Sequence, residues 1–206
     1  MNPSKSHWNK IYATKHPEEV SWTQTIPKLS LDFVHKANMG KKASIIDIGG
    51  GDSRLVDFLV EEGYENISVL DISERALDRA IKRLGKNASK IKWIVSDILD
   101  FIPDTSYDFW HDRATFHFLT EEQQRVKYLS TARQAVKQNG WVTVGTFSTE
   151  GPEKCSGLDI KRYREETLAA EFEKGFIKIE CKTEDHQTPF HSTQNFIFCS
   201  FKRNSN

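Results

Sequence analysis

The chain has 206 residues, a length that fits one domain with a substantial buried core. Its acidic and basic side chains balance at 29 each, so no excess of positive charge favours a nucleic-acid partner. The three cysteines, Cys155, Cys181 and Cys199, are widely spaced and form no Cys-x-x-Cys pair, which suits a reducing compartment and argues against a structural zinc site.

The N-terminal segment, residues 1–40, precedes the first predicted strand. Residues 1–10 are polar and lack the apolar core of a signal peptide. No apolar run anywhere in the sequence approaches the ~20 residues of a membrane span. From these two features we expect a soluble, cytoplasmic protein without a membrane partner.

Three aromatic residues of this segment, Trp8, Tyr12 and Trp22, stand among polar residues. Apolar residues then recur at helical spacing over 26–34, which predicts a helix that ends near Asn38. In one interpretation the segment covers an edge of the sheet and the aromatic residues anchor it there. In the other interpretation it forms a lid over a bound ligand, with Trp22 as the main contact.

Residues 44–53 are the stretch around which the rest of the chain is organised. Ile45, Ile46 and Ile48 form a short β-branched run, which predicts a strand buried on both faces of a parallel sheet. Three glycines follow at once, and residues 54–60 continue with helical spacing. A strand, a glycine turn and a helix in this order make the first half of a nucleotide-binding βαβ unit.

Acidic residues stand at the ends of the next two predicted strands. Asp71 lies about 20 residues beyond the glycines, where such folds place an acid for ribose hydroxyls. Asp97 lies near the end of the following strand. The predicted strands after the glycine turn cover residues 69–71, 93–98, 107–112 and 141–147.

Helices are predicted between these strands. Ser73 caps one helix. A capping box at residues 120–123 opens another, whose apolar face includes Val126 and Val136 and which is expected to end at Gly140.

The C-terminal quarter has a different pattern. A polar loop that carries His186 and His191 is predicted to lie at the substrate end of the sheet, between two strands that alternate apolar and polar residues. The predicted elements are a long loop over 148–160, a helix over 165–172, strands over 176–181 and 195–201, and the polar loop over 183–193.

Residues 47–53, Asp-Ile-Gly-Gly-Gly-Asp-Ser, carry a family resemblance. They resemble the first motif of the class I S-adenosylmethionine-dependent methyltransferases, acid-x-Gly-x-Gly-x-Gly. Ser53 departs from that pattern, and a small serine is compatible with close packing of helix on strand. The acid at Asp47 favours a methyltransferase over a nicotinamide-binding protein.

The resemblance implies an α/β fold with a Rossmann-like, doubly wound sheet of seven strands, mostly parallel with an antiparallel last strand. It implies a single methyltransferase domain over residues 1–206. Within that domain we expect a helical lid at 1–40, a cofactor-binding core at 41–147, and a substrate loop with a closing antiparallel strand pair at 148–206.

The cofactor implied by the resemblance is S-adenosylmethionine, with S-adenosylhomocysteine as its product. Asp71 is expected to accept hydrogen bonds from both ribose hydroxyls, and Asp97 from the adenine amino group. Asp47 is expected to receive the cofactor's ammonium directly or through water, or to bind only the amides of the turn. The predicted cofactor-binding residues are Trp22, Asp47, Gly49, Gly50, Gly51, Asp71, Ile72, Asp97 and Ile98.

The segment after the fourth strand is where this class usually holds the methyl acceptor. His111 and His117 have the intrinsic pKa of a general base near neutral pH. Asp112 is a candidate for fixing a substrate amine, and Arg113 for holding a carboxylate at two points. In the alternative, Asp112 and Arg113 form a pair that stiffens the loop, and the histidines are half-buried.

Two loose resemblances bear on the substrate. Asp112-Arg113-Ala114 together with Gly151-Pro152 resembles thiopurine-type small-molecule methyltransferases, whereas the opening around Trp8 and Trp22 resembles lysine methyltransferases. No (Asn/Asp)-Pro-Pro-(Tyr/Phe) motif follows the fourth strand and no metal cluster is evident, so neither a nucleic-acid substrate nor a required metal is expected. We predict a small-molecule methyltransferase that is a monomer or weak dimer, with a protein lysine methyltransferase and an inactive binding module as alternatives.

Overall fold

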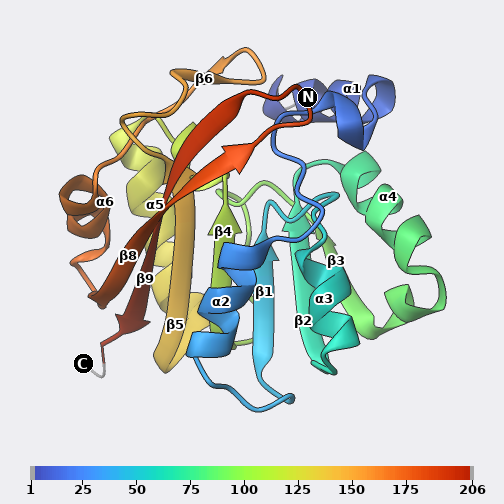
Figure 1. Ribbon diagram of the computed structural model, residues 1–206. Coiled ribbons are helices and arrows are strands. Elements are labelled where there is room, and N and C mark those ends of the chain that lie inside the picture. Colours follow the sequence, from blue (N-terminus) through green and yellow to red (C-terminus); the bar gives the residue numbers. More distant parts are fainter. Residues whose placement is uncertain (1–2, 205–206) are drawn as a thin grey trace.

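A seven-stranded sheet with strand order β3-β2-β1-β4-β5-β9-β8 forms the centre of the computed structural model, which describes residues 3–204 (Figure 1). The first five strands pair in parallel, and β9 runs antiparallel between β5 and β8. This is the predicted fold class. The strands are β1 (Ser44–Ile48), β2 (Asn66–Asp71), β3 (Ile91–Val95), β4 (Tyr107–Arg113), β5 (Val136–Phe147), β8 (Phe176–Gln187) and β9 (Thr193–Arg203).

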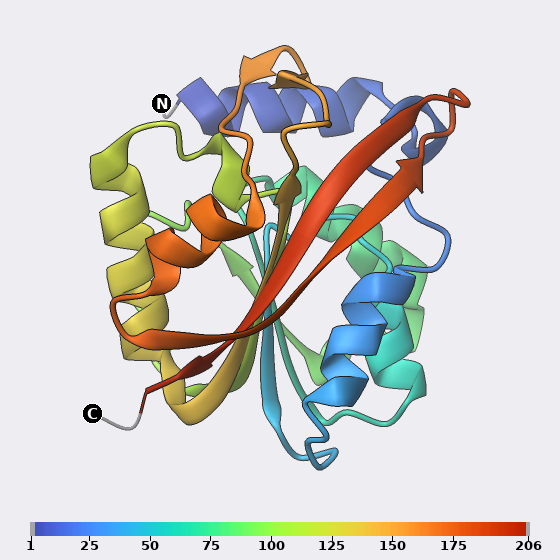
Figure 2. The same cartoon turned by 60° about the vertical axis from the view of Figure 1, so that its left-hand side comes forward.

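Helices cover both faces of the sheet (Figures 1 and 2). The α-helices are α1 (Pro3–Thr14), α2 (Lys28–Lys36), α3 (Leu55–Glu61), α4 (Glu74–Leu84), α5 (Glu122–Ala135) and α6 (Glu165–Phe172). Short 3-10 turns lie at Pro17–Glu19, Gly85–Lys90 and Phe116–Phe118, and a small hairpin pairs β6 (Lys154–Cys155) with β7 (Leu158–Asp159). None of the described helices is long and apolar enough to cross a membrane.

The side chains of β1 show how the two layers are filled. Ile45 packs with residues of α2 and α3 on one face, whereas Ile46 and Ile48 pack with residues of α5 and α6 on the other. All three isoleucines are fully buried. A strand rich in β-branched residues suits this position, because both of its faces are covered, and Asp47 is the polar residue that stands between Ile46 and Ile48.

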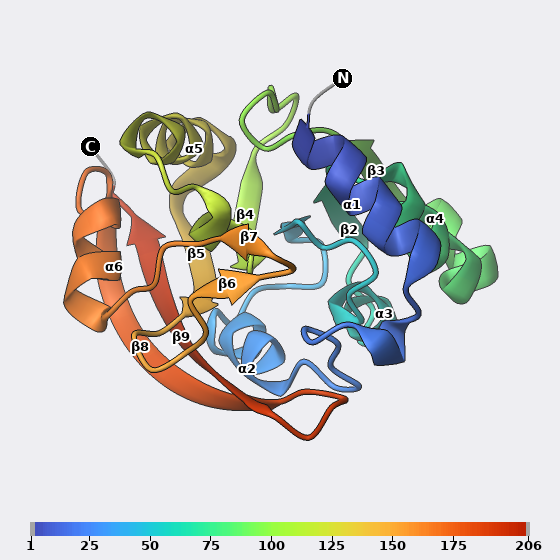
Figure 3. The same ribbon diagram turned by 90° about the horizontal axis from the view of Figure 1, so that it is seen from above.

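The strand β1 lies where the sheet changes direction. The chain continues from β1 to β2 and β3 on one side, and later enters β4 on the other side. Such a switch point leaves a crevice at the carboxyl ends of the strands, where ligands bind in open α/β sheets. Helix α1 lies at this end of the sheet, beside α4 (Figure 3).

The boundary between α5 and β5 differs from the prediction. The helix ends at Ala135, and Val136 begins the strand by pairing with Tyr107. Val126, which was expected on the apolar face, is 58% exposed. Residues 136–140 are therefore part of the strand that pairs with β4, although their helical spacing predicted that the helix would continue to Gly140.

The C-terminal hairpin is longer than predicted. Strands β8 and β9 are separated only by residues 188–192, so most of the predicted polar loop over 183–193 is strand. His186 is therefore buried within β8, where its Nε2 lies 2.6 Å from the carbonyl oxygen of Ser21. His191 lies in the hairpin turn, and neither histidine lines the cavity described below.

Two local features of this hairpin were not anticipated. Cys181 and Cys199 are directly opposed across the two strands and form a disulfide, which the wide spacing of the cysteines did not indicate. The pairing register also shifts between Lys178 and Glu180, so Ile179 is an extra residue that forms a bulge in the edge strand.

Candidate active site

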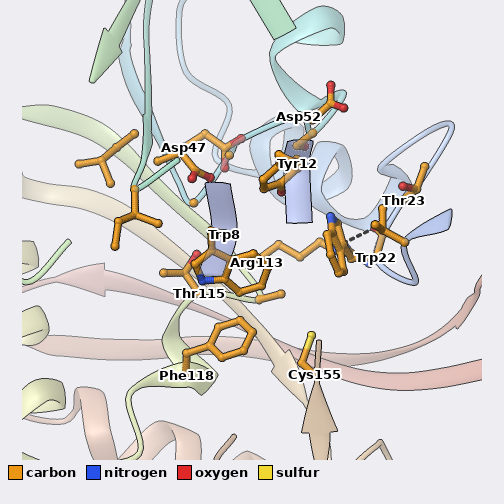
Figure 4. A pocket seen from close by; sticks show the side chains of 18 of the residues that line it. Trp8, Tyr12, Trp22, Thr23, Asp47, Asp52, Arg113, Thr115, Phe118 and Cys155 are labelled. Atoms are coloured by element: carbon orange, nitrogen blue, oxygen red, sulfur yellow. Dashed lines mark hydrogen bonds between the residues drawn. The ribbon is translucent and has the colours of Figure 1, made fainter. Parts of the chain in front are cut away.

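A cavity of about 1010 Å³ occupies the carboxyl end of the sheet. Its floor is formed by the glycine turn after β1 and by the ends of β2 and β4. The N-terminal segment closes it from the opposite side with Trp8, Tyr12 and Trp22. Figure 4 shows Asp47 and Asp52 at one side of this cavity and Phe118 and Cys155 at the other.

The glycine turn has a conformation and surroundings that exclude other residues. Gly49 and Gly51 have positive φ angles of 64° and 40°, in the left-handed region. A Cβ added to Gly50 would lie 2.5 Å from Asp47 Oδ2, and one added to Gly51 would lie 2.7 Å from Asp71 Oδ2. Gly50 and Gly51 therefore bring the main chain close to both carboxylates, where a side chain on either residue would not fit.

Asp71 ends β2 and lines the cavity, as predicted. Its Oδ1 accepts a hydrogen bond from the backbone N–H of Ser73 at 2.7 Å. Burial raises the pKa of Asp71 to about 7, and the nearby Asp47 adds to the rise. Ser73 in turn caps α4 by accepting from the N–H of Ala76, so the end of β2 and the start of α4 are fixed together.

The remaining residues that were predicted to bind the adenosine part of the cofactor also line the cavity. Ile72 follows Asp71 directly, and Asp97 and Ile98 come from the loop after β3. Asp97 Oδ1 accepts from the backbone N–H of Leu99 at 2.9 Å, which tightens this loop. Ile98 is buried and presents an apolar side chain at the cavity wall.

Asp47 and His111 form a buried pair between β1 and β4. Asp47 Oδ1 lies 2.7 Å from His111 Nδ1, and His111 Nε2 lies 2.9 Å from the Oγ of Ser30 in α2. Asp47 Oδ2 is buried and has no hydrogen-bond partner among residues 3–204. Because both ring nitrogens of His111 are engaged, this residue is not placed as a free general base, contrary to the prediction.

Asp112 faces away from the cavity, which corrects the expectation that it fixes a substrate amine. Its Oδ1 accepts from the backbone N–H groups of Thr115 at 2.9 Å and Phe116 at 3.2 Å. Its Oδ2 accepts from the hydroxyl of Tyr128 in α5 at 2.7 Å. Burial raises the pKa of Asp112 to about 6. Its partners are these groups and not Arg113, so the proposed stiffening pair is also absent.

His117, which was predicted as a base, does not line the cavity. Its ring packs against Phe118 and Phe147 at centroid distances of 4.5 and 4.8 Å. Burial, with a contribution from Arg113, lowers the pKa of His117 to about 3. The imidazole is therefore neutral at physiological pH and contributes to packing.

Arg113 lines the cavity, as does His111. Its Nη1 donates to the carbonyl oxygen of Trp22 at 2.9 Å, and its guanidinium lies 4.6 Å from the ring centroid of Phe196. Its Nε and Nη2 are buried without hydrogen-bond partners among the described residues. Burial lowers the pKa of Arg113 to about 10, which still leaves the side chain charged near neutral pH.

Aromatic side chains form the wall nearest Arg113. Trp8 lies edge to face with Trp22 and with Phe118, at centroid distances of 5.8 and 5.3 Å, and Tyr12 lies 6.3 Å from Trp22. Phe118 was not singled out from the sequence, although its position after β4 was. No spacing rule marks it, because a 3-10 turn, and not a regular helix, directs it into the cavity.

Cys155 and an acid–base cluster were also missed. Cys155 lies at the cavity wall as a buried free thiol, and burial raises its pKa to about 12. Asp52 forms an ion pair with Arg83 of α4, which also binds Asp57. These contacts join residues far apart in the chain, so local sequence patterns do not reveal them.

Comparison with known proteins identifies the class. Residues 45–140 match a family model described as "Methyltransferase domain". These residues therefore form a methyltransferase domain, and the chain around them has the Rossmann-like class I fold of S-adenosylmethionine-dependent methyltransferases.

Individual proteins similar to this chain are methyltransferases of several kinds. An "eEF1A lysine and N-terminal methyltransferase" of Mus musculus is 24% identical over 144 residues, which are 69% of this chain and 20% of that protein. A "Malonyl-[acyl-carrier protein] O-methyltransferase 1" of Ilyobacter polytropus is 24% identical over 157 residues, 74% of this chain and 53% of that protein. This chain thus spans between a fifth and about half of these relatives.

A solved structure resembles the fold over nearly the whole chain. The N-methyltransferase NodS from Bradyrhizobium japonicum, in complex with S-adenosylhomocysteine, has a TM-score of 0.75. Its sequence is 15% identical, and the match covers 98% of this chain and 99% of NodS. At this identity the likeness shows a shared fold.

The cofactor of this class is S-adenosylmethionine, and the described residues fit it. The glycine turn lacks the Cβ atoms that would fill the space beside Asp47 and Asp71. The buried, unpartnered Asp47 Oδ2 is a suitable acceptor for the ammonium of the methionine end. Asp71, at a strand end, suits the paired ribose hydroxyls.

Proposed function

We propose that this protein transfers the methyl group of S-adenosylmethionine to a small-molecule nucleophile bound in the same cavity. The observation that carries the proposal is the continuity of that cavity. It joins the glycine turn and the acids of β1 and β2 to the aromatic wall of Trp8, Trp22 and Phe118. A volume of about 1010 Å³ is at the upper end of the range for small-molecule sites, which suits a cofactor and an acceptor together.

The residues proposed to hold the cofactor extend along one side of the cavity. Asp47 would receive the ammonium, Asp71 the ribose hydroxyls, and Asp97 the adenine amino group, with Ile72 and Ile98 beside the ring. When bound, the cofactor supplies an activated methyl group on a sulfonium with a good leaving group. Aromatic faces such as that of Trp22 are favourable neighbours for such a cation.

The protein's own contribution is to bind, orient and exclude water. His111 has both ring nitrogens bonded, and His117 is neutral and outside the cavity. Burial raises the pKa of Tyr12 well above its usual value of 10.0, so its hydroxyl keeps its proton. We therefore propose an acceptor that arrives as a neutral amine, a thiolate or another group that needs no base in this site.

A protein lysine acceptor is the alternative suggested by the mouse relative's name. A folded protein substrate would need an open groove through which its side chain could enter. Here α1 and the residues that follow it lie across the cavity and are bonded to the sheet at several points. This enclosure favours a small acceptor.

Two experiments test the proposal in sequence. Calorimetric titration with S-adenosylhomocysteine should show one binding site, and Asp71→Ala should weaken binding, because the ribose hydroxyls lose a charged acceptor. Cell extract is then incubated with enzyme and methyl-labelled cofactor, and separated by size. Label among metabolites supports the proposal, whereas label confined to one protein band overturns the small-molecule choice. Cofactor binding with label in neither fraction supports an inactive binding module.

The proposal extends to location and assembly. We propose a cytoplasmic monomer or weak dimer that binds no membrane and whose substrate is not a nucleic acid, the last of these supported by the balance of 29 acidic and 29 basic residues. The Cys181–Cys199 pair provides a test, because a disulfide does not persist in a reducing compartment. Alkylation of thiols in intact cells should find both cysteines reduced if the location is cytoplasmic, and bonded if it is not.

A further inference from the structure

The guanidinium of Arg113 has one edge in use and one edge without a partner. Nη1 donates to the carbonyl oxygen of Trp22 at 2.9 Å. The remaining donors, Nε and Nη2, are both buried and without a hydrogen-bond partner among residues 3–204. These two N–H groups lie side by side and point in parallel, which is the arrangement that binds a carboxylate with two hydrogen bonds.

The described residues around Arg113 do not provide this carboxylate. Glu184 and Asp47 are near enough to raise the pKa of Arg113, but neither forms an ion pair with it, and Glu184 Oε2 accepts from Gln24 at 3.2 Å. Cys155 is also near, and its thiol is protonated because burial raises its pKa to about 12. No ion pair to Arg113 occurs within the described part of the chain. A buried cation without a counter-ion is strongly unfavourable, so this arrangement calls for an anionic ligand.

We infer that the Nε–Nη2 edge of Arg113 binds a carboxylate of a ligand in the cavity and that this binding fixes the N-terminal segment. The second part follows from geometry, because the same guanidinium holds the main chain at Trp22 through Nη1. Pairing one edge of a planar group restricts the rotation of the other edge. The ligand carboxylate thereby orders the segment that encloses the ligand.

Two carboxylates have the required chemistry. One belongs to the methionine end of the cofactor, whose ammonium would be met by the free Oδ2 of Asp47 on the neighbouring strand. The other belongs to an acidic methyl acceptor held against Trp8 and Phe118. The inference rests on the proposed function for the identity of these ligands.

The test compares matched ligands with and without a carboxylate. S-adenosylhomocysteine and its decarboxylated analogue are titrated into wild type, Arg113→Met and Arg113→Lys. Benzoate and benzamide, chosen for the aromatic wall, are titrated into the same proteins saturated with decarboxylated analogue. Arg75→Met removes an exposed arginine of α4 and serves as the control for loss of positive charge. Thermal unfolding confirms that each variant is folded.

If the carboxylate is the cofactor's, Arg113→Met should weaken binding of S-adenosylhomocysteine roughly 10- to 100-fold and leave the decarboxylated analogue unchanged. If it is the acceptor's, the same loss should appear for benzoate and not for benzamide. Arg113→Lys should recover only part of the loss, because an ammonium lacks the paired donors. In either case the carboxylate ligand should slow amide exchange over residues 16–24 in wild type and not in Arg113→Met.

Equal affinities of wild type and Arg113→Met for both carboxylate ligands would overturn the inference. The proposed function would stand if S-adenosylhomocysteine still bound. Failure of wild type to bind S-adenosylhomocysteine or its analogue would instead overturn the proposed function. Benzoate is then titrated into the ligand-free protein, and binding lost in Arg113→Met would support the carboxylate site, whereas no such loss would overturn it.

Discussion

Asp112 illustrates how a single buried carboxylate organises the segment that follows β4. It accepts hydrogen bonds from two backbone N–H groups of the turn and from the hydroxyl of Tyr128. Tyr128 also accepts from the indole N–H of Trp110 at 2.8 Å. The network fixes the turn after β4 to α5, and this turn carries Arg113 and Phe118 toward the cavity.

Asp112→Ala should therefore lower the free energy of unfolding by about 2–4 kcal/mol, since one buried and one partly buried N–H group and one buried hydroxyl lose their acceptor. The measurement is urea unfolding at pH 7. Asp104→Ala, at a side chain that is 68% exposed, is the matched control and should change stability by less than about 0.5 kcal/mol. A loss in Asp112→Ala no larger than in the control would show that the network is not stabilising.

Asp71 should make cofactor binding depend on pH. Its pKa in the ligand-free protein is raised to about 7, so the carboxylate is largely protonated at pH 6 and largely ionised at pH 8. The ionised form is the better acceptor for ribose hydroxyls, so affinity should increase with pH, by roughly tenfold across this range. Calorimetry with S-adenosylhomocysteine at both pH values measures the change.

Asp71→Asn is the control for this dependence, because its amide does not titrate. Its binding should be weaker than wild type at pH 8 and nearly independent of pH. A wild-type affinity that is constant from pH 6 to pH 8 would show that Asp71 is already ionised or does not contact the ligand.

At the scale of elements, the N-terminal segment is held to the sheet mainly through its own main chain. Residues of three other elements form hydrogen bonds with this segment. Two of these bonds are to the carbonyl oxygens of Ser21 and Trp22. The contacts are Ser73 with Asn9, Arg79 with the Lys15 carbonyl, His186 with the Ser21 carbonyl, Arg113 with the Trp22 carbonyl, and Gln24 with Glu184.

We predict that this segment behaves as a lid. Trypsin should cut at Lys10 and Lys15 more slowly when S-adenosylhomocysteine is bound, because the ligand adds contacts that oppose local opening. Trp22→Ala should reduce this protection. The measurement is the rate of cleavage at each site by mass spectrometry. Identical rates with and without ligand would show that the segment only packs on the edge of the sheet and is not a lid.

The structural features that could be predicted from the sequence are those determined by residues close together in the chain. The glycine turn and the helix α6 have their determinants within a few residues, and both were predicted. The end of α5 and the extension of β8 were not, because strand pairing decides them. The burial of Asp112 and His117 depends on side chains from α5 and β5, which residue type alone does not reveal.

At the scale of the whole molecule, the parallel and the antiparallel halves of the sheet contribute differently to the site. The parallel half, β3 to β5, brings Asp47, Asp71 and Asp97 to one end, where their loops form the cavity. The antiparallel half, β8 and β9, extends beside the N-terminal segment and contributes His186 and Glu184 to its attachment. The enclosure of the site is therefore a property of both halves.

The bulge at Ile179 has a consequence for the behaviour of this protein in concentrated solution. A strand of 12 residues at the margin of a sheet is a template for intermolecular pairing and aggregation. The extra residue bends and twists β8 at its exposed apolar stretch, beside Ile177. Deletion of Ile179 would bring Lys178 and Glu180 into regular succession against Phe201 and Ser200.

We predict that this deletion leaves the fold intact and makes the protein associate as its concentration rises, detected by light scattering. Ile179→Ala removes the side chain but keeps the bulge, and it should remain as dispersed as wild type. If both variants associate alike, the effect comes from loss of the Ile179 side chain. If neither associates, the bulge does not protect the edge strand from intermolecular pairing. Association of the deletion variant alone would show that the bulge prevents this long edge strand from pairing with other molecules.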